Sequence, residues 1–452
     1  MIKAVAATGA LGTGFKAETL ARAAEGADFI GCDAGSSDPG PYYLGSGQML
    51  ASPAALSRDL ELMIGAGLEH RIPVLVGSAG TAGARPQLER TVEIVRQLAA
   101  RNGWHFKLAI IDSEITPETV AEAFKDGKLI PLGGAPDVDE ASIMAAAHIV
   151  AMQGPDCFID ALSQGADVVI AGRTSDTAIY AAIPIMRGIP KGIAFHAAKI
   201  LECGAASTVE RKYPDSMVGY VDHESFTVEP PNPDMYCTPQ SVASHVLYET
   251  ANPFRLVEPD GVMDTEHSRY EAVSDRAVRV TGSQFDDAET YTVKLEAATA
   301  RGYREIVFGA IRDPLVIDQV DHFIETTQAV VTQKIQDSLG LTPDDFVWRW
   351  SVYGKNGAMG PLEPLNQVEG HEIGLLVEIL ARTQELAAAI GSITWHTALH
   401  QPIPEYAGLV SQIAFPFSPP AVSVGPAYEF SINHAMKLDR PDATYTLTFE
   451  EL

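Results

Sequence analysis

The sequence predicts an α/β protein in three parts: an N-terminal, mostly parallel, doubly wound sheet, a β-rich middle region and a C-terminal ferredoxin-like α+β unit. Over the first two hundred residues, short apolar runs alternate with amphipathic segments, which is typical of parallel strands covered by helices. From about Ala205 the segments alternate in polarity like half-exposed strands, and after Gly302 the expected order is β-α-β-β-α. We therefore expect domains at residues 1–205, 206–300 and 301–452.

The apolar runs of the first part predict buried parallel strands, which are near-continuous hydrophobic stretches. They are Ile2–Thr8, Asp28–Asp33, Ile72–Ser78, Phe106–Asp112, Leu129–Leu132 and Asp167–Ala171. Helices are expected to begin at Ser52-Pro53 and at Thr116-Pro117, where a capping residue precedes a proline. About six strands are too few for a closed barrel of eight, so a doubly wound sheet is favoured.

Alternating polarity predicts the strands of the middle region, at Val218–Val228, Ala277–Thr281 and Tyr291–Leu295. The C-terminal part is expected to contain, in order, strand Arg304–Ile311, helix Leu315–Leu339, strands Phe346–Tyr353 and Glu372–Leu380, and helix Thr383–Leu399. Ala414–Pro420 and Tyr428–Asn433 are candidates for final strands.

The amino-acid composition limits which binding partners and which cellular compartment we expect. With 452 residues, 46% hydrophobic and 20% charged, the chain can bury a sizeable core. A formal net charge of -27 repels phosphate backbones and anionic lipids, so neither nucleic acid nor a membrane is an expected partner. Four scattered cysteines exclude a disulfide framework and a CxxC metal site. We expect a cytoplasmic homo-oligomer that acts on a small molecule.

The first strand-to-helix turn, Thr8–Phe15, is rich in glycine. Gly12 and Gly14 would let a phosphate approach backbone N–H groups at a helix N-terminus. The spacing departs from GxGxxG, however, and no Tyr has a Lys four residues later, as short-chain dehydrogenases require. A nicotinamide site, a generic anion or substrate loop and a purely structural turn all remain open.

Polar side chains follow three expected strands, at the edge where open α/β sheets bind ligands. Asp33, Ser36, Ser37, Asp38, Tyr42 and Tyr43 follow the second strand and offer carboxylates, hydroxyls and rings. Ser78 and Thr81 lie in a small-residue loop after the third strand. Arg173 follows the last strand and is expected to grip a carboxylate, while Asp176 either fixes Arg173 or caps the next helix. The alternative for the second-strand segment is a loop shaped by Asx turns and proline.

Three further features have both a functional and a structural interpretation. Cys203 is a candidate nucleophile near Lys199, although a buried structural thiol is the commoner case. Gly357 lies in a glycine-rich loop that implies close backbone approach to a ligand, to another domain or only within a turn. His396 and His400 have the i, i+4 spacing of metal ligands but no HExxH motif, so helix-surface histidines are favoured and no metal is predicted.

Six segments together resemble the AtuA family of acyclic terpene utilisation proteins. They are ADFIGCDAGSSDPGPYYLGSG, ADVVIAGRTSDTAI, KILECGA, TPQSVASHVLYE, VYGKNGAMGPLEP and GLLVEILARTQELAAAI, in order from about Ile2 to Pro402. The resemblance implies a place in bacterial catabolism of citronellol and geraniol, where intermediates are branched carboxylates and CoA thioesters, and it implies a small companion protein for many members. The family-like positions are Arg173, Asp176, Glu202, Cys203, Gly204, His245, Gly354, Gly357 and Gly360.

These observations favour an enzyme that hydrates, dehydrates or isomerises a branched or unsaturated carboxylate or its CoA thioester. Asp33, Arg173, Asp176 and Cys203 are its expected catalytic residues. No cofactor is predicted, with the CoA thioester serving as substrate. Two alternatives stay open: an NAD(P)-dependent oxidoreductase, and a non-catalytic subunit that needs a small partner protein.

Overall fold

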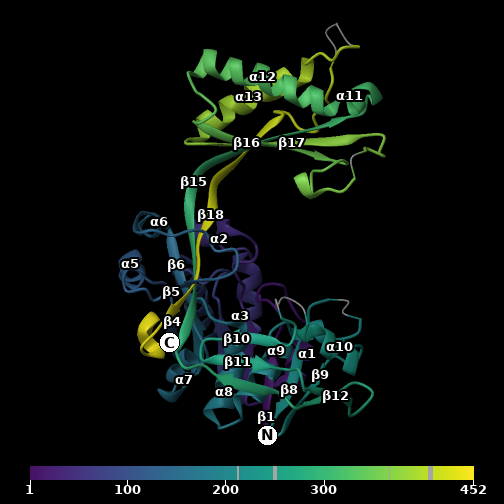
Figure 1. Cartoon of the computed structure of the whole chain (residues 1–452). Coiled ribbons are helices and arrows are strands. Elements are labelled where there is room, and N and C mark those ends of the chain that lie inside the picture. Colours follow the sequence, from purple (N-terminus) through teal and green to yellow (C-terminus); the bar gives the residue numbers. More distant parts are fainter. Residues whose placement is uncertain (211–212, 248–251, 366, 406–410) are drawn as a thin grey trace. The chain divides into compact units, whose positions relative to one another are not determined.

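The computed structural model describes residues 1–210, 213–247, 252–365, 367–405 and 411–452 (Figure 1). The chain forms two compact units. The first consists of Met1–Thr299 and Phe430–Leu452, and the second of Ala300–Glu429. Residues 1–205 and 206–300 thus contribute to one unit, and the three-domain division expected from the sequence stays a prediction.

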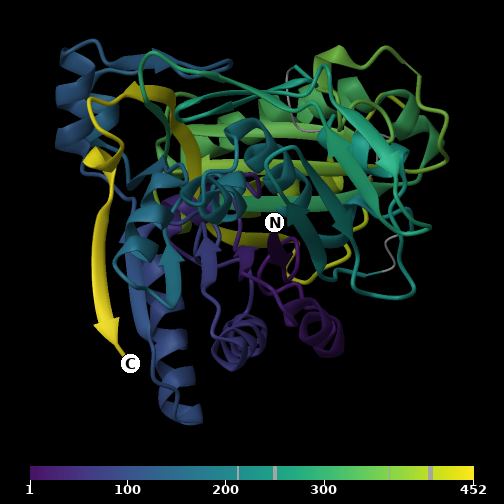
Figure 2. The same ribbon diagram turned by 90° about the horizontal axis from the view of Figure 1, so that it is seen from below.

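The first unit is built on a ten-stranded sheet whose centre is parallel, as predicted. Its order is β12-β13-β9-β8-β1-β2-β3-β7-β4-β19. The parallel strands are β1 (Ile2–Ala6), β2 (Phe29–Asp33), β3 (Val74–Gly77), β7 (Val168–Ala171) and β4 (Lys107–Asp112). Antiparallel strands extend it: β8 (Met217–Val221), β9 (Ser225–Glu229), β13 (Val278–Thr281) and β12 (Arg269–Ala272) on one side, and β19 (Thr446–Glu451) on the other. Figure 2 shows β19 in yellow, running to the C-terminus at one edge.

Helices cover both faces of this sheet, which confirms the doubly wound arrangement. On one face, α1 (Ala17–Ala24), α3 (Pro53–His70) and α4 (Arg85–Asn102) bury side chains with Val5 and Val76. On the other face, α7 (Asp156–Ser163), α8 (Asp176–Met186) and α9 (Lys191–Leu201) pack with Ala4, Ala6 and Leu75. Alternate residues of one strand therefore feed opposite cores, which is why these strands are apolar throughout.

The two predicted helix starts are confirmed. The hydroxyl of Ser52 accepts a hydrogen bond from the Ala55 amide at the start of α3, and Pro53 occupies the first helical position. The hydroxyl of Thr116 does the same for α5 (Pro117–Lys125). A proline at this position forfeits no helical hydrogen bond, because the first amides of a helix have no partner inside it.

The middle region is β-rich, as expected. A small antiparallel sheet is formed by β10 (Arg255–Glu258), β11 (Gly261–Asp264) and β14 (Gln284–Asp287). The remaining short helices of the first unit are α2 (Pro41–Ser46), α6 (Glu140–Met144), α10 (Pro239–Val246), η1 (Gly204–Ser207) and η3 (Pro441–Thr444).

One expected parallel strand has a different neighbour. Leu129–Leu132 does contain a strand, β5 (Leu129–Pro131), but β5 pairs antiparallel with β18 (Ala421–Lys437) and lies outside the central sheet. A strand not predicted, β6 (His148–Met152), pairs antiparallel with the start of β15 (Thr292–Ile311). The expectation of a parallel strand here was wrong because residues from the far end of the chain supply the pairing partner.

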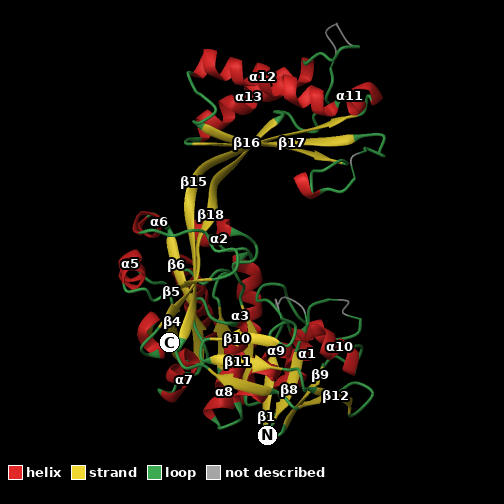
Figure 3. Cartoon of the chain, in the orientation of Figure 1, coloured by secondary structure: helices red, strands yellow, loops and turns green. Residues whose placement is uncertain are grey.

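The second unit has the ferredoxin-like arrangement. Its elements are the second part of β15, α11 (Pro314–Asp318), α12 (Val320–Leu339), β16 (Phe346–Tyr353), η2 (Gly360–Leu362), β17 (Ile373–Ala381), α13 (Gln384–His400) and the first part of β18. The sheet order β16-β17-β15-β18 places the last strand beside the first, and both long helices lie on one side of the sheet (Figure 3). This is the β-α-β-β-α-β topology that the order of elements predicted.

Three boundaries in this part differ from expectation. The predicted strands Tyr291–Leu295 and Arg304–Ile311 belong to one twenty-residue strand, β15, which runs through Gly302. The predicted helix is divided at Gln319 between α11 and α12. Ala414–Pro420 contains only a single bridge, from Ala414 to Ala310, whereas the predicted strand Tyr428–Asn433 lies within β18, the last strand that the second unit contains. Among the described residues, we find no helix with the length and apolar character needed to cross a membrane.

Candidate functional site

The carboxyl ends of the parallel strands bring three predicted residues to one edge of the sheet. Asp33 is the last residue of β2, Ser78 follows β3 and Arg173 follows β7, and these three strands are neighbours in the sheet. The loops interlock closely. A Cβ on Gly35 would lie 2.6 Å from the Thr81 carbonyl oxygen, and a Cβ on Gly83 would lie 2.2 Å from the Arg173 amide nitrogen. Only glycine permits this contact, so the loops hold Asp33 and Arg173 in fixed positions.

Arg173 is buried in an internal network. Its Nε donates to Oε2 of Glu296 at 2.8 Å, and its Nη1 donates to the Ser78 hydroxyl at 3.1 Å. The Ser37 hydroxyl donates to the other oxygen of Glu296 at 2.6 Å. Burial alone would raise the pKa of Glu296, but Arg173 and Lys294 outweigh it and lower that pKa to about 2. Ser37, Ser78 and Arg173 are thus brought together around a carboxylate.

Arg173 keeps a donor for a ligand. Within the part of the chain that the structure describes, Nη2 has no hydrogen-bond partner. Oδ1 of Asp176 lies 3.8 Å from Nη1, so this carboxylate lies beside the guanidinium, and its role in fixing Arg173 stays a prediction. The cap of α8 is Ser175, and Asp176 is the first residue inside the helix. The substrate-gripping role of Arg173 stays a prediction.

Asp33 is a buried carboxyl group with an unused oxygen. Its Oδ2 accepts a hydrogen bond from the Gly35 amide at 3.1 Å, while Oδ1 finds no partner among the described residues. Burial raises the pKa of Asp33 well above its ordinary value, and the neighbouring Asp176 raises it further, whereas Arg173 opposes the rise. Burial therefore favours the neutral, protonated form of Asp33 more than water does.

Two glutamates join Asp33 and Asp176 in what we call the carboxyl cluster: Asp33, Asp176, Glu202 and Glu258. Lys199 Nζ lies 2.5 Å from Glu202 Oε1, yet burial raises the pKa of Glu202 to about 8. Glu258 accepts hydrogen bonds from the hydroxyls of Ser175 and Thr177, at 3.0 and 2.6 Å, and burial raises its pKa to about 8. Carboxyl groups that titrate near neutrality are suited to proton transfer.

The end of α9 is fixed against the first turn of the chain. A Cβ on Gly9 would lie 2.5 Å from the Cys203 carbonyl oxygen, and one on Gly204 would lie 2.7 Å from the Gly9 amide nitrogen. Gly204 also has a φ of +56°, which favours glycine. This contact places Cys203 directly beside the loop that follows β1.

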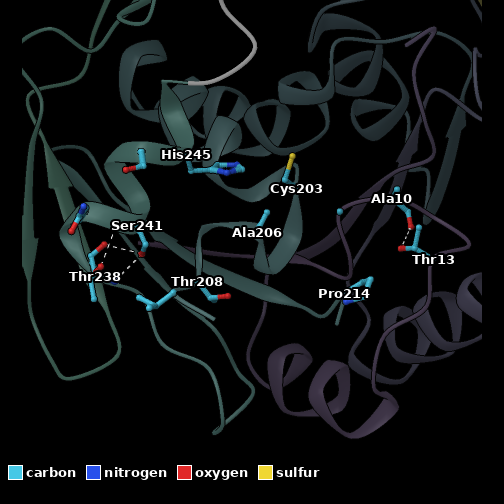
Figure 4. A pocket seen from close by; sticks show the side chains of 13 residues that line it. Ala10, Thr13, Cys203, Ala206, Thr208, Pro214, Thr238, Ser241 and His245 are labelled. Carbon is cyan, nitrogen blue, oxygen red and sulfur yellow. Dashed lines mark hydrogen bonds between the residues drawn. The ribbon is translucent and has the colours of Figure 1, made fainter. Parts of the chain in front are cut away.

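Cys203 and His245 line a pocket of about 880 Å³, which we call the thiol pocket (Figure 4). Figure 4 shows the His245 ring, on α10, directed toward Cys203. The other lining residues are small or neutral and polar: Gly9, Ala10, Thr13, Ala206, Thr208, Val209, Pro214, Thr238, Gln240, Ser241 and Ser244. Of the four cysteines, Cys32, Cys157 and Cys237 are buried and Cys203 alone is partly exposed.

The glycine-rich first turn has an internal acceptor. The amides of Gly12 and Gly14 both donate to Oδ2 of Asp59, at 2.9 and 3.1 Å, and Asp59 is fully buried. A carboxylate of the protein therefore occupies the place that an anionic ligand would take in two of the alternatives. The turn alternative is consistent with this geometry, and a ligand role for Gly12 and Gly14 stays a prediction.

The remaining candidates are spread more widely. Ser36 accepts a hydrogen bond from the Asp38 amide at 3.1 Å, and the Thr81 hydroxyl accepts one from the Leu50 amide at 2.9 Å. Tyr42 and Tyr43, in α2, stack edge to face with ring centroids 5.4 Å apart. Gly357 belongs to the second unit, where a Cβ would lie 2.9 Å from the Tyr353 amide nitrogen, so the close approach occurs within its own loop. None of these interactions tests a ligand role.

Histidine side chains lie in the interior of the first unit and on a helix of the second. His196 is an interior histidine: Nδ1 lies 2.7 Å from the Ser283 hydroxyl, Nε2 lies 3.2 Å from the Tyr270 hydroxyl, and burial lowers its pKa to about 3. The rings of His396 and His400 are 6.0 Å apart on α13. Across the described ranges, no three or more His, Cys, Asp or Glu side chains are grouped so as to hold a metal ion.

Comparison with known protein families shows which family the chain belongs to. A family model described as Acyclic terpene utilisation family protein AtuA matches residues 53–208 and 224–423, which is most of the chain. The chain belongs to the AtuA family. The matched segments of this AtuA family member contain Arg173, Asp176, Glu202, Cys203 and His245, whereas Asp33 precedes them. The comparison with curated proteins found no match, and neither did the comparison with solved structures.

Three acidic residues of these networks were not predicted from the sequence. Glu258 and Glu296 come from the middle region, and Asp59 lies inside α3. Burial is what distinguishes these glutamates from surface acids. The one available signal was that Glu296 lies among the apolar residues of a strand, Leu295, Ala297 and Ala298. A charged residue in such a stretch is normally paired.

Proposed function

We propose that this AtuA-family protein is a catabolic enzyme that hydrates, dehydrates or isomerises a branched or unsaturated carboxylate or its CoA thioester. The observation that carries the proposal is the unused Oδ1 of Asp33, a buried carboxyl group at the ligand-binding edge of the sheet. Family membership supports a role in terpene utilisation.

Dehydration needs an acid, a base and a group that stabilises negative charge. A base removes a proton from the carbon beside the carbonyl, the hydroxyl group leaves with a proton from the acid as water, and the double bond forms. Asp33, whose pKa is raised by burial, supplies the acid, and a second member of the carboxyl cluster, in its ionised form, supplies the base. Nη2 of Arg173 donates to the carboxylate or carbonyl oxygen where negative charge develops.

These residues accomplish the steps without a cofactor, so none is proposed. Isomerisation uses the same groups, because one carboxyl group removes a proton and another returns it at a different carbon. In the oxidoreductase alternative, the phosphates of a dinucleotide would need amides that Gly12 and Gly14 already donate to Asp59. We therefore place this alternative second.

The test is a turnover screen with matched variants. The purified chain is incubated with branched unsaturated and hydroxy acids and their CoA thioesters. Mass spectrometry follows gain or loss of one water, and chromatographic separation before it detects double-bond isomers of unchanged mass. Asp33→Asn is expected to lower the rate about a hundredfold or more, the usual contribution of a positioned acid. Asp156→Asn is the control. The carboxyl group of Asp156 also has a raised pKa, but it accepts a hydrogen bond from the Tyr291 hydroxyl at 2.9 Å and lies outside the carboxyl cluster.

Two results would count against the proposal. Equal rates for Asp33→Asn and the wild type would remove Asp33 from the chemistry. If the wild-type chain turns over none of the panel compounds, the alternative in which it is a subunit that needs a small partner protein is favoured. Co-purification from the native host would then identify that partner.

A further inference from the structure

The thiol pocket opens beside a second pocket of about 480 Å³, which we call the outer pocket. The two pockets share Thr13 and Pro214 in their walls, and both lie in the first unit. The charged and aromatic side chains that also line the outer pocket include Lys16, Arg58, Asp59 and Tyr213. A ligand that fills both would run from the cationic side chains of Lys16 and Arg58 into a pocket whose described lining has no charged side chain.

The outer pocket holds two cations in a protein whose net charge is -27. Lys16 Nζ lies 4.4 Å from the centre of the Tyr213 ring, and a hydrogen bond to Tyr213 raises the pKa of Lys16, with the carboxylates of Asp215 and Asp234 adding to the rise. Lys16 is therefore charged at neutral pH.

Arg58 is also available to an anion. Its side chain is 48% exposed, with Nη1 donating to Asp59 Oδ1 and Nη2 to the Phe15 carbonyl oxygen, each at 2.6 Å. A guanidinium has five donors, so others remain for a ligand. The Asp59 carboxylate neutralises the charge of Arg58 only in part, because Asp59 also accepts hydrogen bonds from the amides of Gly12 and Gly14.

The thiol pocket has the opposite character. Among its described lining residues there is no Asp, Glu, Lys or Arg, and hydroxyl and amide side chains alternate with small apolar ones. Such a surface suits an uncharged chain that carries amide groups and a thioester. Cys203 and His245 lie in this part.

We propose that the two pockets together bind an acyl thioester of coenzyme A, with the phosphates against Lys16 and Arg58 and the pantetheine arm in the thiol pocket. The thioester lies at the Cys203 end of that pocket, where the preceding residue, Glu202, belongs to the carboxyl cluster and lies near enough to Asp33 to affect its pKa. This inference rests on the proposed function and names its substrate class as the thioester rather than the free acid. The phosphates contact side chains rather than the glycine amides, which are engaged by Asp59.

Binding is measured by calorimetry, independently of turnover. Wild-type protein is titrated with coenzyme A, dephospho-coenzyme A, pantetheine and inorganic pyrophosphate at two salt concentrations. Coenzyme A is expected to bind more tightly than pantetheine, by about tenfold for each charged contact, and its binding is expected to weaken as salt rises. Pyrophosphate should compete with coenzyme A but bind less tightly, since it fills the outer pocket alone.

Variants locate the site. Lys16→Ala is expected to raise the Kd of coenzyme A about tenfold and to leave pantetheine binding unchanged. Lys125→Ala is the matched control, because Lys125 is 57% exposed and paired with Glu140 on the surface of the same unit. Both lysines are accessible to solvent, so neither variant should impair folding.

The thioester end has its own readout. Cys203 is the one partly exposed cysteine, so iodoacetamide should modify it first, and coenzyme A should slow that modification at least tenfold when it saturates the site. Equal affinities for coenzyme A and pantetheine, absence of binding by both, or unprotected Cys203 would overturn the proposal. Turnover of a free acid that depends on Asp33 would then leave the proposed function standing.

Discussion

Replacing Glu296 with Gln should destabilise the first unit severely. Glu296 is only 5% exposed and holds Arg173, Lys294 and Ser37 at once. The fall of its pKa from 4.5 to about 2 corresponds to about 3 kcal/mol of stability carried by the carboxylate. Breaking a buried pair by removing one partner costs a similar amount, about 3–5 kcal/mol, because the remaining charge stays buried. We therefore expect Glu296→Gln to lower the free energy of unfolding by about 3 kcal/mol at pH 7.

Urea denaturation followed by circular dichroism measures this loss. Glu429→Gln is the matched control, because Glu429 pairs with Arg301 where both side chains are about half exposed, and its loss should stay within about 0.5 kcal/mol. The pH dependence follows from the lowered pKa of Glu296. The carboxylate contributes its full share to the free energy of unfolding above about pH 4.5, and this share is lost as the pH falls toward 2. A loss below about 1 kcal/mol at pH 7 would refute the buried-pair reasoning.

Two further predictions concern the same edge of the sheet. Burial raises the pKa of Glu258 from 4.5 to about 8, so the folded protein binds the extra proton and the free energy of unfolding falls as the pH rises through that window. Glu258→Gln should flatten this fall, and an unchanged pH profile would contradict it. Gly83→Ala should cost more than Gly103→Ala in thermal unfolding, by about 2 kcal/mol or more. The two glycines have similar positive φ, +71° and +65°, but only at Gly83 would the Cβ meet another atom, the Arg173 amide nitrogen at 2.2 Å. Equal losses of stability in the two variants would contradict this prediction, because they would show that the loop at Gly83 moves to accommodate the Cβ without cost.

The local pattern of apolar and polar residues was sufficient to predict most of the fold. The continuous apolar runs at β1, β2 and β7 predicted buried parallel strands because both faces of the sheet are covered. Periodicity also predicted the order of elements in the second unit. The pattern failed where pairing is non-local: β5 and β6 take their partners from β18 and β15, which lie far along the chain.

The site was predicted in part, for a related reason. Strand ends placed Asp33, Ser78 and Arg173 together, since parallel strands share one carboxyl edge. The carboxylates that complete the network, Glu258 and Glu296, come from segments whose position depends on tertiary packing. Likewise, the glycine spacing of the first turn gave no indication that Asp59 would accept both amides.

Asp33 is proposed to transfer protons at this edge of the sheet. The most direct measurement is incorporation of deuterium from heavy water into bound branched acyl-CoA thioesters and free acids, followed by mass spectrometry, because a proton-transfer site exchanges hydrogen even without net conversion. We predict exchange with the wild type and Asp156→Asn, and a loss of about a hundredfold or more with Asp33→Asn when folding is intact. Exchange that is unchanged in Asp33→Asn would contradict the claim.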